Sequence, residues 1–260
     1  MTSPSEPRTP RLYHAGAGSA LPPLAALAVL SGGLASILVI GSVAHDLGLS
    51  VLVALTVSGL LLVLLPLGAV WKLGLRGDAL GLRWPQVRPV IAAVLIGCTA
   101  WLVNVRIVQL FPFEEGQLKS LNAVVDQPPL VVALLAIAAV PAVCEELLFR
   151  GAVQRALTTR LFPIAAVVLT ALLFSGYHMS LIQLLPTFTL GLLLGALAHR
   201  ADSVVPAMIA HFLNNTMAIL VARRQPAVLA ETIAAHPNAA LVGCAIVSAV
   251  GVALLVKGPA

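Results

Sequence analysis

The chain has 260 residues, of which 60% are hydrophobic and 10% are charged, and its mean hydropathy is +1.03. Soluble domains contain about 25% charged residues, so the composition excludes a soluble protein and predicts an integral membrane protein. The net charge of +5 comes from cations scattered at the ends of apolar segments. That distribution favours loops facing the cytoplasm over a surface that binds nucleic acid.

Residues 1–20 are polar and rich in Pro, Ser, Thr and Gly, which predicts a disordered cytoplasmic tail. The rest of the chain, residues 21–260, repeats apolar runs of the length that crosses a hydrocarbon core of about 30 Å. We therefore expect an all-α membrane protein in which about eight transmembrane helices form one polytopic bundle. The expected spans cover residues 21–44, 49–71, 89–111, 128–157, 163–178, 181–199, 204–221 and 239–257.

The loop charges predict the orientation of these spans. The most basic connection, residues 72–88, carries four cations and one acid, so the positive-inside rule places it in the cytoplasm. The N-terminus and the C-terminus then lie on the cytoplasmic side, and the acidic connection with Glu114 and Glu115 lies outside. Arg223 and Arg224 follow the seventh span and also fall outside, against the same rule.

Two adjacent carboxylates, Glu145 and Glu146, and the cation Arg150 interrupt the fourth span. A charge at the bilayer centre costs about 2.5 to 3.5 kcal/mol on insertion scales, so each needs a function or a partner. Glu146 and Arg150 are four residues apart with the Glu first, the favourable order for a helical ion pair. Glu145 has Phe149 at its own i+4 position and is left without a local cation. Proton transfer and a structural charge cluster both explain Glu145 at this point.

Further polar side chains follow in the next three spans, which very short turns join as antiparallel neighbours. His178 ends the sequence F-S-G-Y-H, and His211 precedes Asn215 by four residues in A-H-F-L-N-N, with Asn214 as the competing assignment. A lone buried histidine is usually structural, but these residues occur together with the carboxylates of the fourth span. Their co-occurrence favours one polar site. The sixth span adds a G-x-x-x-G pattern, which is typical of close helix packing.

These residue types suit hydrolysis of a peptide bond. A carboxylate and an imidazole can hold and deprotonate a water, and an imidazole and an amide can donate to the resulting oxyanion. The sequence lacks H-E-x-x-H, G-x-S-G and G-x-G-D, the motifs of other intramembrane proteases. Cys144 is better explained as a packing residue than as a nucleophile, because an apolar helix disfavours its thiolate.

A metal is the alternative to direct water activation. Glu145, His178 and His211 could form an open catalytic site for a divalent ion such as zinc. If Glu146 is occupied by Arg150, these three side chains are the ligands that remain. We favour activation without a cofactor, and the metal site stays open as the second possibility.

Three motifs, E-E-x-x-x-R at residues 145–150, F-x-x-x-H at residues 174–178 and H-x-x-x-N at residues 211–215, occur in this order. They resemble the motifs of the CAAX protease and bacteriocin-processing family, also called CPBP or Abi. That family includes the Ras-converting CAAX prenyl endopeptidase. The resemblance covers about Val131 to Leu220, so the catalytic core is expected within residues 128–222.

The resemblance implies an intramembrane endopeptidase whose helices enclose a conical polar cavity open to the membrane and the cytosol. It implies that Glu145 and His178 activate water and that His211 and Asn215 form the oxyanion hole. The supporting residues that it implies are Glu146, Arg150 and Phe174.

The expected partners are the lipid bilayer and a peptide or protein substrate that enters from the membrane or the cytosol. A composition rich in Ala, Leu, Gly and Arg with few lysines is typical of a bacterial protein, which suggests the cytoplasmic membrane. Most bacteria do not prenylate proteins, so a prenylated substrate is one candidate among membrane-associated peptides. The alternative functions are a non-catalytic bacteriocin self-immunity protein and a transporter. The missing inverted repeat disfavours the transporter.

Overall fold

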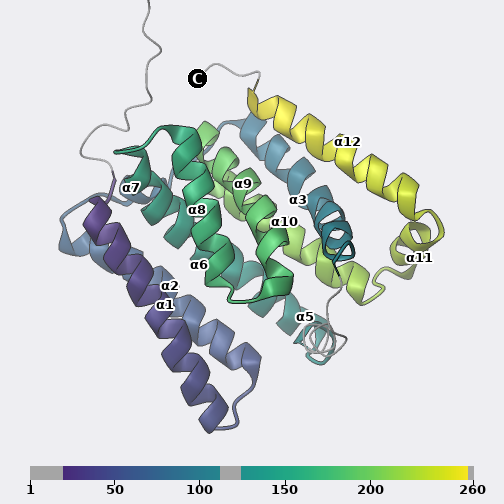
Figure 1. Cartoon of the computed structure of the whole chain (residues 1–260), viewed down its shortest axis with the longest axis horizontal. Coiled ribbons are helices and arrows are strands. Elements are labelled where there is room, and N and C mark those ends of the chain that lie inside the picture. The colour runs from purple at the N-terminus through teal and green to yellow at the C-terminus, as the bar shows by residue number, and fades with distance from the viewer. Residues whose placement is uncertain (1–19, 112–123, 257–260) are drawn as a thin grey trace, which may run out of the picture.

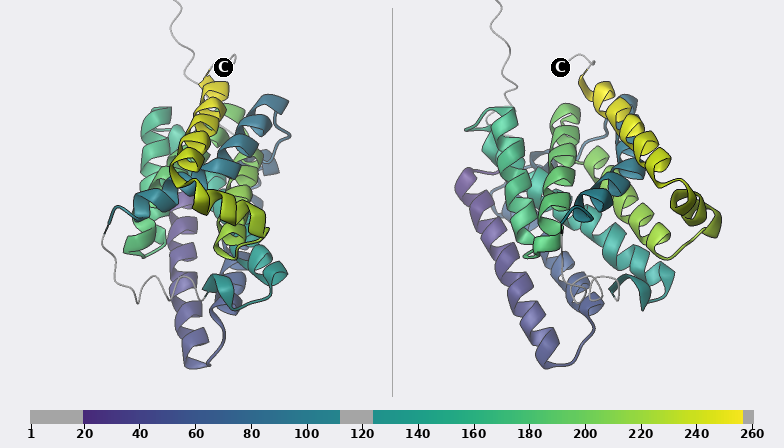
Figure 2. Two further views of the ribbon diagram at one scale, coloured as in Figure 1. Left: turned by 90° about the vertical axis from the view of Figure 1, so that its right-hand side faces the viewer. Right: turned by 45° about the vertical axis from the view of Figure 1, so that its right-hand side comes forward.

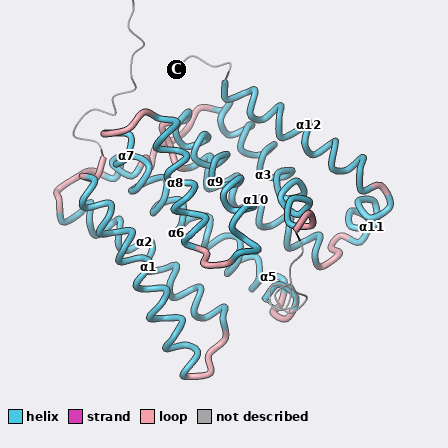
Figure 3. The backbone as a smooth tube through the Cα atoms, in the orientation of Figure 1, coloured by secondary structure: helices cyan, strands magenta, loops and turns pink. Residues whose placement is uncertain are grey.

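The computed structural model describes residues 20–111 and 124–256, and all regular structure in these two segments is helical (Figures 1 and 3). The predicted tail at residues 1–19, the acidic connection at residues 112–123 and Lys257 lie outside the described residues. The α-helices are α1 (Pro23–Asp46), α2 (Val51–Lys72), α3 (Val87–Val108), α5 (Leu130–Ala133), α6 (Val140–Glu146), α7 (Arg155–Thr158), α8 (Pro163–Tyr177), α9 (Leu181–Ala201), α10 (Val205–Ala222), α11 (Ala227–Ala235) and α12 (Pro237–Val256).

The described part of the chain contains seven helices that are long and apolar enough to cross a membrane, so the chain is an all-α polytopic membrane protein. The fourth of them is the continuous helix Leu130–Thr158, which confirms the unusually long fourth span. The expected fifth span is shorter than the others, because α8 has only 15 residues. At 1.5 Å per residue it is about 22 Å long, so the turn that begins at His178 lies short of a full crossing.

The long fourth helix contains two π-helical stretches. The wider π-helical turns η2 (Leu134–Ala139) and η3 (Leu147–Gln154) alternate with the α-helical segments α5, α6 and α7. Pro141 explains the first stretch, because proline has no N–H for the carbonyl four residues earlier and its ring clashes with that carbonyl. The second π-helical stretch begins directly after the two glutamates and contains Arg150. Such turns are frequently found at functional sites.

The helices form three groups, and two of them pack directly against this fourth helix. The antiparallel pair α1 and α2 lies on one side, and α8, α9 and α10 lie close to the middle of the molecule (Figures 1 and 2). On the other side α3 packs between α10 and α12. Gly97 permits the close approach of α3 to α10, since a Cβ there would lie 2.6 Å from the carbonyl oxygen of Ala210. The connection between α10 and α12 contains the short helix α11.

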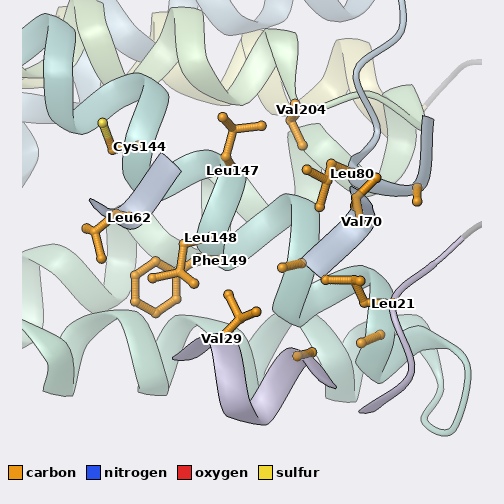
Figure 4. Close-up of a cluster of buried hydrophobic side chains, with 14 of the residues drawn as sticks. Leu21, Val29, Leu62, Val70, Leu80, Cys144, Leu147, Leu148, Phe149 and Val204 are labelled. Carbon is orange, nitrogen blue, oxygen red and sulfur yellow. The ribbon is translucent and has the colours of Figure 1, made fainter. Parts of the chain in front are cut away.

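A hydrophobic cluster fills the space between α1, α2, η1 (Gly77–Leu80) and the fourth helix (Figure 4). Leu148 and Phe149 of η3 are fully buried in it. Cys144 is 4% exposed in the same cluster and forms no disulfide, in agreement with its expected packing role. This apolar surface covers the fourth helix on the side facing α1 and α2.

The loop charges are held by specific contacts at both ends of the bundle. At the basic end, Asp202 closes α9 in a left-handed conformation with φ 47° and binds Arg83 and Arg155. At the other end, Arg223 donates to the carbonyl oxygens of Val125 and Pro128. This contact gives Arg223 a structural role at a position that the positive-inside rule disfavours.

Candidate active site

Glu146 and Arg150 form the predicted ion pair in the middle of the fourth helix. Arg150 Nη1 donates to Glu146 Oε1 at 2.8 Å, and both side chains are 0% exposed. Their separation of four residues carries them from the end of α6 into η3 on the same side of the helix. A fully buried carboxylate is tolerable only when paired and hydrogen-bonded. The pair therefore gives each of these two buried side chains a hydrogen-bonded partner inside the bundle.

His211 of α10 lies between the two glutamates. Its Nδ1 atom lies 2.9 Å from Glu146 Oε1, and because a carboxylate only accepts, Nδ1 carries the proton and donates. Its Nε2 atom lies 3.9 Å from Glu145 Oε2. That separation exceeds a direct hydrogen bond, and a single water can bridge it. We call Glu145, Glu146, Arg150 and His211 the buried cluster.

The same guanidinium connects the buried cluster to α9 and α8. Arg150 Nη2 donates to the carbonyl oxygen of Gly191 at 3.0 Å, and its Cζ atom lies 4.5 Å from the centre of the Phe174 ring. One turn further, Gln154 Nε2 donates to the carbonyl oxygen of Gly195 at 2.9 Å. A Cβ at Gly195 would lie 2.7 Å from Gln154 Oε1, and one at Gly191 would lie 3.0 Å from Ala171 of α8, so the G-x-x-x-G pattern permits the predicted close packing against η3 and α8. Phe174 packs on Arg150, and its supporting role stays a prediction.

His178 follows the last residue of α8 and is partly exposed. Its Nδ1 atom lies 2.9 Å from the carbonyl oxygen of Phe174. A carbonyl accepts but cannot donate, so Nδ1 carries the proton and the neutral ring has its lone pair on Nε2. The spacing F-x-x-x-H thereby has a local physical reason: it fixes the tautomer that can act as a base.

Phe174 is the ring that the two histidines share. Its centroid lies 4.9 Å from that of His178 and 6.0 Å from that of His211, both in edge-to-face arrangement. Since the Arg150 guanidinium also contacts this ring, one aromatic side chain touches three of the predicted site residues. The three sequence motifs therefore meet around Phe174.

Asn215 is hydrogen-bonded to the π-helical stretch η2 of the fourth helix. Its Nδ2 atom donates to the carbonyl oxygen of Ile137 at 3.0 Å, and Ile137 precedes Pro141 by four residues. This is the carbonyl that proline leaves without its usual helical donor. Asn214 Nδ2 in turn donates to Asn215 Oδ1 at 3.1 Å. Asn215 thus holds α10 against η2 and keeps one further amide N–H for another acceptor.

Glu145 and His178, predicted to activate water together, are not joined by a hydrogen bond or an ion pair. Glu145 is the more accessible carboxylate, with 16% of its side chain exposed, and its Oε2 atom is buried without a hydrogen-bond partner. The nearby imidazole in the described structure is that of His211. Shared water activation by Glu145 and His178 therefore stays a prediction, as does the assignment of Asn215 over Asn214.

No group of three His, Cys, Asp or Glu side chains is arranged to hold a metal ion anywhere in residues 20–111 and 124–256. The trio Glu145, His178 and His211 considered for zinc is therefore not brought together as a ligand set. The chemistry proposed below assigns no step to a metal.

Two partners in this site were missed from the sequence. We assigned Glu146 to Arg150 alone, whereas its Oε1 atom is shared by Arg150 and His211. We also overlooked Gln154, which is 3% exposed. Gln154 lies four positions after Arg150, and Gly195 lies four positions after Gly191. This equal spacing was a usable signal. No sequence signal indicated that Arg150 and His211 share Glu146 Oε1, because this contact depends on the packing of α10.

Comparison with known proteins adds an independent result. Residues 127–217 match the family model described as type II CAAX prenyl endopeptidase Rce1-like. A search of curated proteins found no match, and a search of solved structures found none. The matched segment contains all three motifs and every residue of the buried cluster. This match supports the resemblance of residues 127–217 to the CAAX protease family, within an integral membrane protein.

Proposed function

We propose that this protein is an intramembrane endopeptidase that hydrolyses peptide bonds with a water activated by Glu145. The observation that carries the proposal is the position of Glu145. Its carboxylate is partly accessible and lies 3.9 Å from His211, which Glu146 and Arg150 hold from the other side. A buried ion pair thus positions an imidazole beside a second carboxylate that has no cation of its own.

The first step is attack of water on the scissile carbonyl carbon. Glu145 holds the water and takes one proton from it while the water oxygen forms a bond to carbon. The Nε2 lone pair of His178 is the second acceptor for that water in this proposal. The proton then passes to the nitrogen of the leaving amine as the carbon–nitrogen bond breaks. General acid–base catalysis of this kind contributes about 10² to 10⁴ in rate.

The second requirement is stabilisation of the oxyanion. In its protonated form, His211 would donate from Nε2, because Nδ1 already donates to Glu146. Asn215 would use the amide N–H that does not bind Ile137. Donors fixed before the reaction stabilise the developing charge without reorganisation.

We propose that the substrate is a membrane-associated peptide or protein, prenylated or unprenylated, in a bacterial cytoplasmic membrane. The Rce1-like match supports cleavage near a lipidated C-terminus, and the depth of the site in the fourth helix supports a membrane-bound substrate. The basic residues at one end of the bundle support a cytoplasmic position for both termini.

The decisive experiment compares Glu145→Ala and His178→Ala with the unmodified protein in proteoliposomes. Two internally quenched peptides, one with a farnesylated cysteine and one without, serve as probes. We expect each substitution to lower kcat by about 10²-fold or more, because each removes a group that handles the proton of the water. Glu231→Ala, an exposed change on α11, is the matched control and should keep full activity. Full activity in either site variant would overturn the mechanism.

A chelation experiment tests the metal alternative separately. We expect the rate to survive exhaustive chelation with EDTA or 1,10-phenanthroline, because the proposed proton transfers need only the protein side chains. Loss of activity that added zinc restores would replace this mechanism with a metal-dependent one.

A further inference from the structure

Tyr177 places a buried hydroxyl next to the candidate active site. The side chain is 7% exposed, and its Oη atom is buried without a hydrogen-bond partner. Buried polar atoms in folded proteins almost always have a partner. A buried hydroxyl without one, directly before His178 in the chain, therefore suggests a partner that arrives with the substrate.

The hydroxyl lies over the face of the fourth helix that carries Glu145. The Tyr177 ring packs edge to face on Phe149, with centroids 5.2 Å apart. Its Oη atom and a methyl carbon of Leu148 lie 3.3 Å and 3.4 Å from the point where a Cβ on Gly33 would stand. Leu148 and Phe149 follow Glu145 by three and four residues and share its face. The Glu145 charge also interacts electrostatically with Tyr177.

Gly33 of α1 keeps space next to this hydroxyl. A Cβ at Gly33 would lie 3.0 Å from a Leu62 methyl carbon and 3.3 Å from Tyr177 Oη, closer than most side-chain contacts. The neighbouring Gly32 is different, since a Cβ there would meet only Leu65 at an ordinary 3.6 Å. The α1 and α2 pair, outside the matched residues 127–217, thus contributes a wall beside Tyr177.

Two other side chains of the site already donate to acceptors within the protein. Asn215 donates to Ile137, and the Nδ1 atom of His211 donates to Glu146. The O–H of Tyr177 has no such acceptor. A donor of this kind gains most from an acceptor on which negative charge develops, because no existing bond has to be broken first.

We propose that Tyr177 is a further catalytic residue that donates a hydrogen bond to the oxygen of the scissile carbonyl. This role rests on the proposed endopeptidase function. The negative charge reaches the carbonyl oxygen when the water oxygen bonds to the carbonyl carbon, and the Tyr177 O–H bond to it then strengthens. The phenol keeps its own proton throughout, and the proton of the water goes to Glu145.

The test is Tyr177→Phe, which removes the hydroxyl and keeps the ring on Phe149. We expect kcat with the farnesylated quenched peptide to fall by about 10²-fold, the cost of one oxyanion donor, with KM nearly unchanged. Thermal stability in detergent should not fall, because the removed group has no partner in the free protein. A kcat within about twofold of the unmodified protein would overturn the role of Tyr177, since it would exclude an effect of the size expected for an oxyanion donor.

A second pair of variants tests the same hydroxyl from α1. Gly33→Ala should lower kcat by crowding Tyr177 Oη, whereas Gly32→Ala should leave it unchanged. Equal kcat values for the two alanine variants would count against the proposal.

Glu145→Ala separates the two proposals. If that variant is inactive while Tyr177→Phe keeps full activity, only the role of Tyr177 is wrong. If Glu145→Ala keeps full activity, the endopeptidase mechanism fails and the role of Tyr177 fails with it.

Discussion

The middle and the end of the fourth helical span hold charges in very different ways. In the buried cluster, Glu146 and Arg150 are 0% exposed and His211 is 3% exposed. A second group, Asp78, Arg83, Arg155 and Asp202, lies where the span ends; we call it the end cluster. Its side chains range from 12% exposed for Arg155 to 44% for Asp78. Both groups tie neighbouring elements to the fourth helix, but only Glu146, Arg150 and His211 are withdrawn from water, while Glu145 beside them is 16% exposed.

This difference assigns different roles to similar ion pairs. In the end cluster, water and salt screen the charges, so each pair contributes little to stability. In the buried cluster, each charge depends on its partner, because an unpaired ion in the interior is strongly unfavourable. Such a cluster is expensive to maintain. Glu146, Arg150 and His211 lie beside Glu145, which fits a role in the proposed catalysis better than a role in stability.

The largest effect is expected from Arg150→Met, which leaves Glu146 buried without its cation. Removing one partner of a buried ion pair costs about 3 to 5 kcal/mol, and the contacts to Gly191 and Phe174 are lost as well. Unfolding by SDS titration in mixed micelles measures the loss. The double variant Glu146→Gln with Arg150→Met should recover part of it, because the uncompensated charge is gone. A loss below about 1 kcal/mol for the single variant would mean that this pair behaves like an exposed one.

Much of the fold could be predicted because the bilayer imposes strong rules. The spans follow from runs of apolar residues, and α2, expected at residues 49–71, begins at Val51 after the capping residue Ser50. The fifth span was expected at residues 163–178, and α8 does end at Tyr177, but with 15 residues it is shorter than the helices that are long enough to cross a membrane. The helix α11 was missed because its nine residues carry no clear periodic signal.

The candidate site was predicted less completely than the fold. The pair Glu146 and Arg150 follows from helical spacing alone, which is a local property. The shared contact of Glu146 with His211, and that of Asn215 with Ile137, depend on how α10 packs against the fourth helix. Pro141 hinted at the second contact, because a proline frees a carbonyl four residues earlier. No comparable signal in the sequence indicated the contact between Glu146 and His211.

A smaller effect is expected from Asp202→Asn in the end cluster. Asparagine tolerates the left-handed conformation at this position, so the substitution removes the charge with little backbone strain. Loss of the contacts to Arg83 and Arg155 should cost about 1 kcal/mol. The same titration at about 0.1 M and about 1 M salt, where the screening length falls from about 10 Å to about 3 Å, should show a smaller cost at high salt. An effect as large as that of Arg150→Met and independent of salt would remove the contrast between the clusters.

The smallest effect is expected from Asp78→Asn. Its carboxylate lies 3.8 Å from Arg83, and the two side chains are 44% and 38% exposed, so water already solvates both charges. Arg83 also keeps its contact with Asp202 when Asp78 is neutral. We therefore expect a change within about 0.5 kcal/mol, the range of most surface substitutions, and unchanged cleavage of the quenched peptides. A cost above about 1 kcal/mol would show that the end cluster acts as one cooperative network. In that case the contrast between the clusters would depend on how many partners each charge has, and burial alone would not explain it.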